Sequence, residues 1–268
     1  MPDFSKYYDK YSVLANFAFM KALFAKSSNI RKQSLRNRQA DYARLGAAPK
    51  LLELHRELNQ CLVEARAEWK SHDYGEGYFY QGLSALGITG LRDTDARVAA
   101  MELEKRVAGK TVLEVGCNSG FLSLAIAASA KRVVSFDINP HVIRMAQLGE
   151  RFLERDNVHF SVAAFEDLPE EEPFDCVLSF ANHSTYDGNT RHSIEAYFDR
   201  CRTLTAKGGH LLFESHPPAH EGKGLEDVLA TIAARFEIEE QRTLHYGYFL
   251  DHGRTFAVAR REDVSLRK

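Results

Sequence analysis

The chain has 268 residues, of which 44% are hydrophobic and 27% are charged, and its formal net charge is -2 at pH 7. These values fit one large folded domain, or a domain with a smaller appendage, and argue against bulk electrostatic attraction to nucleic acid or to a membrane surface. The four cysteines form no C-x-x-C pair, so we expect neither disulfides nor a thiolate zinc site, and we expect a reducing cytoplasm as the setting.

The N-terminal part of the chain is expected to be helical. Hydrophobic residues recur there at three- and four-residue spacing, which is typical of helices with one buried face. Two stretches show this spacing, marked by Val13, Phe17, Met20 and Phe24, and by Leu51, Leu54, Leu58 and Leu62. The first ten residues are too polar for a signal peptide, and the apolar run at 14–25 is too short to cross a bilayer.

Positive charge is concentrated in residues 21–50, which hold eight basic residues against one acid, Asp41. The basic residues are Lys21, Lys26, Arg31, Lys32, Arg36, Arg38, Arg44 and Lys50. A solvated helix face accounts for such charge, and so does a surface for a phosphate-bearing substrate, for RNA or for an anionic membrane. Few aromatic residues interleave with the basic ones, unlike in modules that bind single-stranded RNA.

Strands and helices alternate from residue 111 onward. Before them, 71–91 is rich in glycine and aromatic residues and is expected to be irregular, and 96–108 is expected to be a helix capped by Asp93. Strands are predicted over 111–115, 132–137, 157–161, 174–180, 210–215, 236–244 and 253–260, and helices over 119–130, 140–153, 191–205 and 224–235. Regular alternation of this kind indicates a parallel sheet covered by helices, and the last two strands would close it as a hairpin.

The run 111–124 carries the most informative local pattern in the chain. An aliphatic strand that contains Glu114 ends in a turn of small residues, Gly116, Asn118 and Gly120, and an apolar helix follows at once. This arrangement places a ligand at the carboxyl edge of a parallel sheet. A dinucleotide site would need a third glycine at position 121, where Phe121 stands instead. Asn118 is compatible with the turn because asparagine adopts left-handed backbone conformations more readily than most residues.

The E-x-G-x-N-x-G pattern of residues 114–120 resembles motif I of the class I S-adenosylmethionine (SAM)-dependent methyltransferases. The resemblance implies an α/β fold with a seven-stranded, mostly parallel, doubly wound sheet and an antiparallel last strand. It implies a SAM-dependent methyltransferase domain over 91–268, preceded by an N-terminal helical extension, 1–90, that caps the substrate site. It also implies SAM as the cofactor, with backbone at the glycines approaching the methionine part and Glu114 accepting from its ammonium group, directly or through water.

Two further segments fit the same resemblance. Asp137 ends the second strand, where a carboxylate would bind the ribose diol, although an acid there would suit a nicotinamide cofactor equally well. Ile138 would pack on the adenine. Residues 163–169 resemble the adenine-binding segment of the family, with Glu166 or Asp167 accepting from the adenine amino group and the Phe165 N–H donating to the ring.

The segment just before motif I resembles two methyltransferase groups. One comprises the tRNA wobble-uridine carboxymethyltransferases, and the other is associated with polysaccharide biosynthesis. The similarity covers residues 80–82 and 87–94. In that position Arg92 or Arg97 would hold the cofactor carboxylate or a substrate phosphate through a two-pronged guanidinium contact, although either arginine could equally form a surface ion pair.

The acceptor is expected to meet the methyl group above the end of the fourth strand, where the polar loop 181–192 follows Phe180. His183 is the leading candidate for the general base, and Tyr186 and His192 are alternatives. Glu214 and His216 end the next strand and would reach the same cleft, with Glu214 orienting an imidazole. No compact ligand motif points to a metal. No N-P-P-[YF] sequence follows the fourth strand, which favours oxygen over nitrogen as the acceptor atom.

Three functions are compatible with these patterns. The first is O-methylation of a small anionic or sugar-containing acceptor, the second is modification of tRNA through the basic N-terminal helices, and the third is a catalytically silent partner protein with the SAM fold. The residues expected at the cofactor are Arg92, Glu114, Gly116, Cys117, Asn118, Gly120, Asp137, Ile138, Phe165, Glu166 and Phe180. The residues expected at the chemical step are His183, Tyr186, Glu214 and His216.

Overall fold

The computed structural model describes residues 13–69, 74–168, 172–183, 192–217, 219–247 and 253–262, with side chains from residue 28 onward. The elements in chain order are α1 (Val13–Leu45), α2 (Pro49–Glu68), β1 (Gln81–Gly82), η2 (Ser84–Leu86), β2 (Arg92–Asp93), α3 (Thr94–Ala100), α4 (Leu103–Val107), β3 (Thr111–Val115), α5 (Phe121–Ile126), β4 (Arg132–Asp137), α6 (Pro140–Phe152), β5 (Val158–Val162), η3 (Phe165–Asp167), β6 (Phe174–Phe180), α7 (Ile194–Leu204), β7 (Thr205–Glu214), α8 (Lys223–Ala233), β8 (Glu237–Leu244) and β9 (Arg254–Arg260).

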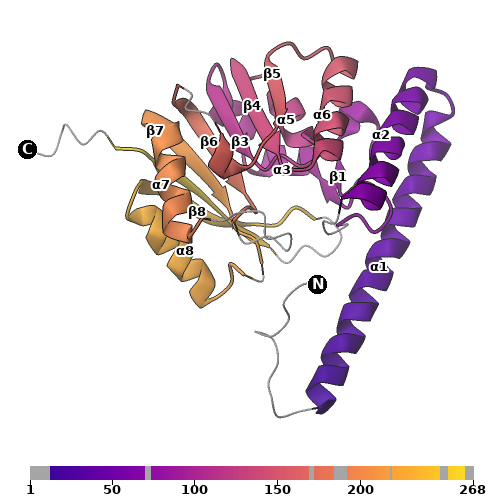
Figure 1. Ribbon diagram of the computed structural model, residues 1–268, viewed down its shortest axis with the longest axis horizontal. Coiled ribbons are helices and arrows are strands. Elements are labelled where there is room, and N and C mark those ends of the chain that lie inside the picture. The colour runs from indigo at the N-terminus through magenta and orange to yellow at the C-terminus, as the bar shows by residue number, and fades with distance from the viewer. Residues whose placement is uncertain are drawn as a thin grey trace, which may run out of the picture.

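The strands β3 to β9 form a single seven-stranded sheet in the order β5-β4-β3-β6-β7-β9-β8 (Figure 1). Strands β3 to β7 are mutually parallel, and β9 runs antiparallel to both of its neighbours, β7 and β8. The central strands are apolar along most of their length because helices cover both of their faces. The expected mostly parallel sheet with an antiparallel last strand is therefore confirmed.

Helices cover the two faces of the sheet as two separate hydrophobic layers. On one face, α2 to α6 bury residues such as Leu58, Val98 and Phe121 against the sheet. On the other face, α7 and α8 bury residues such as Phe198 and Val228. The carboxyl edge of the sheet stays accessible between these layers, which leaves the strand ends free to build a site.

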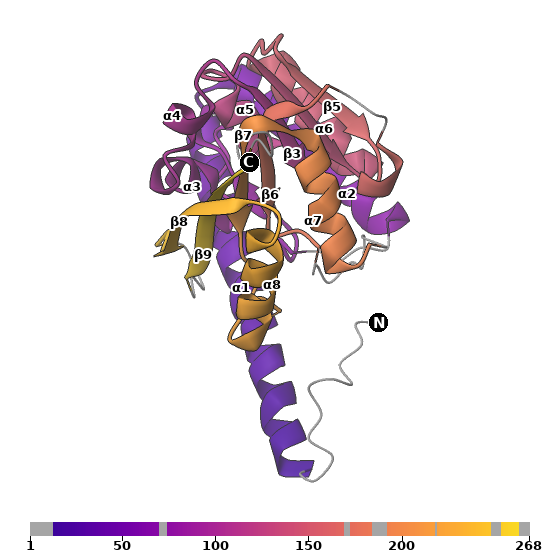
Figure 2. The same ribbon diagram turned by 90° about the vertical axis from the view of Figure 1, so that its left-hand side faces the viewer.

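The long helix α1 runs beside α2 and continues past the body of the molecule (Figures 1 and 2). Near its C-terminal end, α1 is anchored by Asp41, a fully buried carboxylate. Asp41 accepts hydrogen bonds from the hydroxyl of Tyr78 at 2.8 Å and from the N–H of Thr89 at 2.7 Å. The helix thereby holds the glycine- and aromatic-rich segment that leads into β2.

Three elements differ most from those expected. The helix predicted over 96–108 is broken into α3 and α4, because Glu102 has a left-handed φ of 52°. The helix predicted over 119–130 ends at Ile126, because the chain turns so that the N–H of Lys131 can donate to the carbonyl oxygen of Lys110 at 2.9 Å at the start of β4. The strand predicted over 210–215 begins earlier, at Thr205, which pairs with Phe174 before an irregularity in the ladder.

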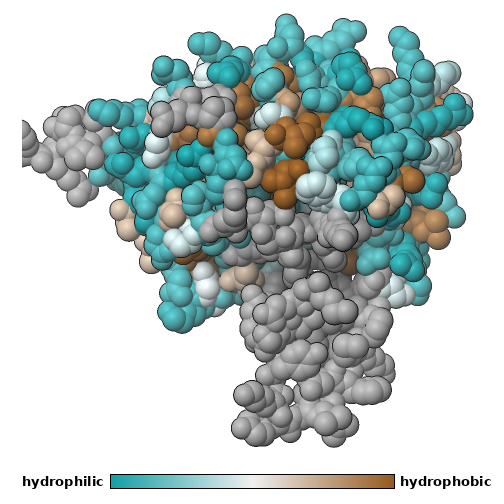
Figure 3. Space-filling view, in the orientation of Figure 1, coloured by the Kyte–Doolittle hydropathy of each residue, from teal (hydrophilic) through white to brown (hydrophobic). Residues whose placement is uncertain are grey.

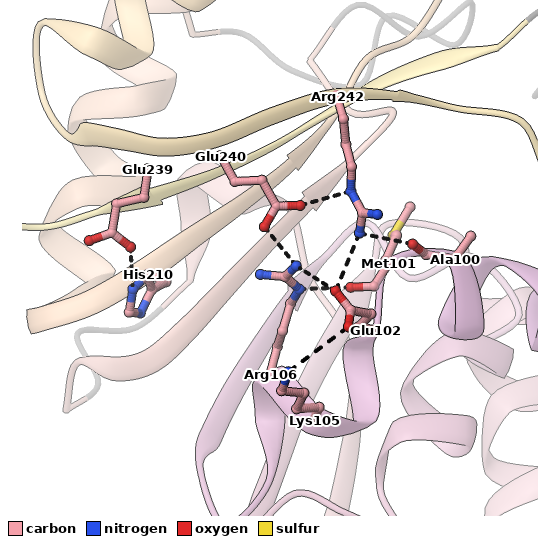
Figure 4. Close-up of polar contacts among 9 residues, drawn as sticks. All are labelled: Ala100, Met101, Glu102, Lys105, Arg106, His210, Glu239, Glu240 and Arg242. Atoms are coloured by element: carbon pink, nitrogen blue, oxygen red, sulfur yellow. Dashed lines mark hydrogen bonds and ion pairs between the residues drawn. The ribbon is translucent and has the colours of Figure 1, made fainter.

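The break at Glu102 is held by a network of ion pairs (Figure 4). Arg106 of α4 binds both Glu102, at 3.2 Å, and Glu240 of β8, at 2.7 Å. Arg242 of β8 lies 3.6 Å from Glu102 and 2.8 Å from Glu240. Lys105 also lies 4.0 Å from Glu102, so three basic side chains meet two carboxylates here, and together they tie the helices before β3 to the edge strand β8.

The surface in the orientation of Figure 1 is mostly hydrophilic, with some hydrophobic residues near the middle of that face (Figure 3). None of the helices within the described ranges combines the length and the apolar composition needed to cross a bilayer.

We expect Gly120→Ala to destabilise the fold far more than Gly109→Ala. Both glycines have left-handed φ values, 71° and 68°, so alanine is strained at either position by about 1 kcal/mol. A Cβ at Gly120 would also lie 2.5 Å from the Cβ of Ala146 and 2.6 Å from the ring of Phe160, whereas a Cβ at Gly109 meets no atom within 4 Å. Overpacking adds about 1–3 kcal/mol, so we expect a total loss of about 3 kcal/mol for Gly120→Ala.

Denaturant unfolding of the two variants measures this difference. Equal losses of unfolding free energy would show that close packing at Gly120, where α5 meets α6 and β5, is not what requires glycine in the motif.

Candidate active site

A cavity lies at the carboxyl edge of the sheet, and every parallel strand contributes to its wall. The contributions come from the residues at, or just beyond, the end of each strand. They are Val115, Gly116 and Asn118 after β3; Phe136, Asp137 and Ile138 at β4; Ala163 and Phe165 after β5; Phe180, Ala181, Asn182 and His183 at β6; and His216 after β7. Tyr74, Tyr80, Gln81, Arg92 and Tyr197 complete the described lining. In an open α/β sheet this edge is where ligands bind.

The turn after β3 has the backbone that its sequence indicated. Gly116, Asn118 and Gly120 all have left-handed φ values, 63°, 53° and 71°. Gly116 and Asn118 line the cavity, so the structure brings backbone to the cavity wall at both positions. Gly120 lies outside the lining and its lack of a side chain serves the packing of α5 against Ala146 and Phe160.

Asp137 presents an oriented carboxylate to the cavity. Its Oδ2 accepts from the N–H of Asn118 and its Oδ1 accepts from the N–H of Asn139, both at 3.0 Å. The first bond joins the end of β4 to the glycine turn after β3. These contacts orient the group, and a carboxylate is the kind of acceptor that the hydroxyls of a ribose require.

Apolar side chains line the cavity beside Asp137. The rings of Phe136 and Phe165 are nearly parallel, with an interplanar angle of 5° and centroids 6.1 Å apart. Ile138 and Ala163 belong to the same wall. A flat, weakly polar ring such as adenine suits this surface. Glu166, which was expected to contact the adenine, is outside the described lining.

Glu114 and Cys117 are buried behind the cavity wall and do not form part of it. The hydroxyl of Ser123 donates a hydrogen bond to Glu114. Burial raises the pKa of Glu114 to about 7, against the opposing effects of the bond from Ser123 and of the charge on Arg97. The expected contact of Glu114 with the cofactor ammonium is therefore not one that this geometry makes directly.

The loop after β6 is strained on both sides of Asn182. Ala181 and His183 have left-handed φ values of 57° and 65°, which are unfavourable for side chains other than glycine and asparagine. The amide of Asn182 donates to the carbonyl oxygen of Val115, and its Oδ1 lies only 2.5 Å from where a Cβ on Gly116 would stand. Asn182 thus joins the loops after β3 and β6, and it explains why position 116 must be glycine.

His183 lines the cavity as a neutral imidazole. Burial lowers its pKa from the usual value of 6.5, outweighing hydrogen bonds that would raise it. Its Nε2 lies 3.2 Å from the carbonyl oxygen of His192, which can only accept, so Nε2 is assigned as the donor in this contact. Tyr197 packs edge-on against the imidazole at 5.2 Å. Tyr186, the alternative base, lies outside the described residues.

Glu214 binds arginines rather than an imidazole. Its carboxylate is fully buried, pairs with Arg92 and with Arg97 at 2.8 Å, and accepts from the hydroxyl of Tyr246 at 2.7 Å. Burial alone would raise the pKa of Glu214, but the charges of the arginines outweigh burial and hold the pKa well below its usual range. Among the described residues, no histidine is hydrogen-bonded to this carboxylate, so the expected orienting role is not the one that the geometry shows.

His216 lies in the cavity wall and is 8% exposed. Its N–H donates to Nδ1 of His220 at 3.0 Å. His220 is itself buried, and burial is the main cause that lowers its pKa to about 4. His220 is therefore neutral and serves to fix the backbone at His216. No group of three or more His, Cys, Asp or Glu side chains in the described ranges is arranged to hold a metal ion.

Nine lining residues were not among the site residues predicted from the sequence. They are Tyr74, Tyr80, Gln81, Val115, Phe136, Ala163, Ala181, Asn182 and Tyr197. Gln81 accepts from the hydroxyl of Ser119 at 3.2 Å, which ties the segment before β2 to the turn after β3. The glycine- and aromatic-rich composition of 71–91 was the available signal for three of them, whereas nothing local marks Tyr197, which lies within a helix.

Residues 106–244 match the family model described as a methyltransferase domain. The ubiquinone biosynthesis O-methyltransferase of Xanthomonas campestris pv. campestris (strain B100) is 37% identical over 190 residues, which cover 69% of this chain and 72% of that protein. The enzyme of the same name from Nitrosospira multiformis is 35% identical over 78 residues, and the match covers 29% of this chain and only 32% of that protein. A third, from Xylella fastidiosa (strain 9a5c), is matched over 44% of its length at 34% identity.

Solved structures share the fold. The N-methyltransferase NodS from Bradyrhizobium japonicum WM9 superposes with a TM-score of 0.50 at 18% identity, covering 63% of this chain and 96% of that one. A putative class I SAM-dependent methyltransferase from Listeria monocytogenes gives a TM-score of 0.50 at 15% identity, covering 65% and 61%. At these identities the likeness is one of fold. By its sequence, this chain belongs to the methyltransferase domain family, and the solved structures quoted above share its fold.

Proposed function

We propose that this chain transfers the methyl group of SAM to an oxygen atom of a small-molecule acceptor, with His183 as the general base. The observation that carries the proposal is the neutral imidazole of His183 in the wall of the cavity that also contains the turn after β3 and Asp137. A neutral imidazole accepts a proton, which a hydroxyl acceptor must lose when it is methylated.

The residues of the cavity fit SAM from one end to the other. Asp137 would bind the ribose hydroxyls, and the wall that contains Ile138 and Phe165 would hold the adenine. Gly116 and Asn118 both line the cavity, so their backbone could approach the methionine part. Bound there, SAM supplies a methyl group made electrophilic by the positive charge on its sulfur.

The strand order supports a chemical step beside His183. The ends of β4, β3 and β6 are consecutive along the sheet, so Asp137, Gly116 and His183 follow one another along the cavity. The acceptor hydroxyl would give its proton to the imidazole of His183 as the oxygen takes the methyl group. Phe180 and Tyr197 flank this position and would exclude water, which strengthens the electrostatic interactions of the reacting groups.

Oxygen is supported as the acceptor atom by the curated relatives. Those quoted above bear the name ubiquinone biosynthesis O-methyltransferase, and one of them matches over most of its length. The N-terminal segment 1–90 is proposed to help set specificity, since Tyr74, Tyr80 and Gln81 reach the cavity from it.

A labelled-methyl assay tests this function. The protein is incubated with SAM carrying a radioactive methyl group and either a panel of catechols and hydroxybenzoates or bulk tRNA, at low and high salt. We expect label in small-molecule ethers, with weak dependence on salt. Label transferred to tRNA, with a steep loss at high salt, would favour the RNA function of the basic helix α1 instead. Binding of SAM without transfer to any substrate would favour a silent partner protein.

A further inference from the structure

Tyr197 of helix α7 lines the cavity and packs on the proposed base, His183. We propose that Tyr197 is a positioning residue for the methyl transfer, whose ring fixes the imidazole that would receive the proton of the acceptor. The proposal rests on the function proposed above, in that His183 is taken as the base. It adds a residue that acts on the reaction through His183 and not by touching the reacting atoms.

The first support is the contact between the two rings. The centroids of Tyr197 and His183 lie 5.2 Å apart, and the ring planes meet at 65°, which is an edge-to-face arrangement. Aromatic rings prefer such an arrangement to a face-to-face one, so the contact favours one orientation of the imidazole.

The second support is that Tyr197 is itself held in place. It is 1% exposed, and its hydroxyl lies 2.8 Å from the hydroxyl of Ser179 in β6. Its ring packs on Phe165 at 4.9 Å and on Phe198 at 5.1 Å. Ser179 comes four residues before His183, so Tyr197 contacts both the strand that leads into the loop and the imidazole that the loop carries.

The start of α7 holds the imidazole at a second point. Nε2 of His183 lies 3.2 Å from the carbonyl oxygen of His192. The next residue, Ser193, caps α7 by accepting from the N–H of Ala196 at 3.2 Å. The helix packs on β6 and β7 (Figure 1). One anchored helix end therefore supplies both the carbonyl oxygen at Nε2 and the ring of Tyr197.

The third support is the backbone of His183, which needs such contacts. Its φ of 65° is left-handed, a conformation that residues other than glycine keep mainly where their surroundings impose it. A general base must stay within hydrogen-bond reach of the proton that it takes, and a displacement of about 1 Å can lower a rate about 100-fold. The contacts from α7 meet this requirement at the imidazole.

The titration of His183 reports on the ring contact, because burial is the main cause that lowers the pKa of the imidazole. Glu195 raises that pKa and His192 lowers it, and His220, which interacts electrostatically with His183, is neutral near pH 7. The other titratable residues of the described lining are Tyr74, Tyr80, Arg92, Asp137 and His216. A variant that lacks only the ring of Tyr197 keeps all of these groups and admits water to the imidazole, so the pKa should rise toward 6.5.

The test is an NMR titration of the full chain with labelled histidine rings. The signal of His183 is identified as the one that is missing from His183→Asn, and its midpoint is measured in the wild-type protein, Tyr197→Leu, Tyr197→Phe and Phe198→Leu. Phe198 is the matched control, since it is also 1% exposed, is next to Tyr197 in α7 and lies outside the described lining of the cavity. In parallel, kcat and the KM for SAM are measured with 3,4-dihydroxybenzoate as the acceptor.

We expect Tyr197→Leu to raise the midpoint of His183 by about half a pH unit. It should lower kcat about 10- to 100-fold and keep the KM for SAM within about threefold, because the imidazole acts on the acceptor. Tyr197→Phe keeps the ring and should retain the wild-type midpoint and kcat, and so should Phe198→Leu. If Tyr197→Leu fails to fold, Tyr197→Met, which fills more of the space but has no flat ring, should give the same shift.

Three results would overturn the proposal. They are an unchanged midpoint in Tyr197→Leu, an equal shift in Phe198→Leu, and a loss of kcat in Tyr197→Phe as large as that in Tyr197→Leu, which would assign the effect to the hydroxyl. Because the titration needs no methyl transfer, a failure of the proposed function would be seen separately, as full turnover by His183→Asn.

Discussion

Replacing His183 by asparagine is expected to lower kcat by two to three orders of magnitude. General base catalysis typically contributes about 10²–10⁴-fold, and asparagine cannot accept the proton. Asparagine is preferred to alanine for this test because it tolerates the left-handed φ of 65° at position 183. The measurement is kcat at saturating SAM and acceptor, with the affinity for S-adenosylhomocysteine expected to stay within about threefold because the imidazole acts on the acceptor.

The pH dependence of the activity is a second test of the role of His183. Burial lowers the pKa of His183 below 6.5, and only the neutral imidazole can accept a proton. Wild-type activity should therefore be level above about pH 6.5 and decline in more acidic solution as the ring is protonated, whereas His183→Asn should lose that decline. His210→Ala changes a histidine that pairs with Glu239, at the other end of the sheet from the cavity, and should leave kcat unchanged (Figure 4). Full turnover by His183→Asn would remove it from the mechanism.

Replacing Asp137 by alanine is expected to weaken S-adenosylhomocysteine binding by about 100-fold, or about 2.7 kcal/mol. Hydrogen bonds to a charged group contribute about 1.5–3 kcal/mol each, and a carboxylate can bind both ribose hydroxyls. Asp137 also organises the turn after β3, since it accepts from the N–H of Asn118. Calorimetric titration of the folded variant measures the change.

Asp175→Ala is the matched control for Asp137. Asp175 also accepts from a backbone N–H, that of Thr111 at 2.8 Å, but it lies at the start of β6, at the opposite edge of the sheet from the cavity. We expect this variant to lose stability and to keep its affinity for S-adenosylhomocysteine. An equal loss of affinity in both variants would mean that Asp137 acts through general stability and not through the ligand.

The sequence was sufficient for the central strands and for the turn after β3. Strands β3, β4 and β6 have the predicted bounds because a strand buried on both faces is a short apolar run with clear ends. The end of helix α3 could not be predicted from the local apolar pattern. Its break at Glu102 depends on ion pairs with Arg106 and with Arg242, which lies 140 residues further along the chain.

The same difference applies to the candidate site: residues placed by neighbouring sequence could be predicted, and contacts between distant parts of the chain could not. Asn118 and Asp137 could be placed because the strand and turn that carry them are read from neighbouring residues. The partners of Glu214 could not, since Arg92 and Arg97 are 122 and 117 residues away in sequence and meet it only when β2 lies over the end of β7. The contact of the Asn182 side chain with the turn at Gly116 could not be predicted either, because it forms only where the loops after two neighbouring strands meet.

The most direct test of SAM binding at the carboxyl edge of the sheet is calorimetry of the wild-type protein with S-adenosylhomocysteine. We expect one molecule to bind per chain with a micromolar dissociation constant, and crystals of that complex to show its ribose on Asp137 and its sulfur between Gly116 and His183. Absence of binding, or a ligand bound away from this cavity, would contradict both the site and the methyl transfer proposed for it.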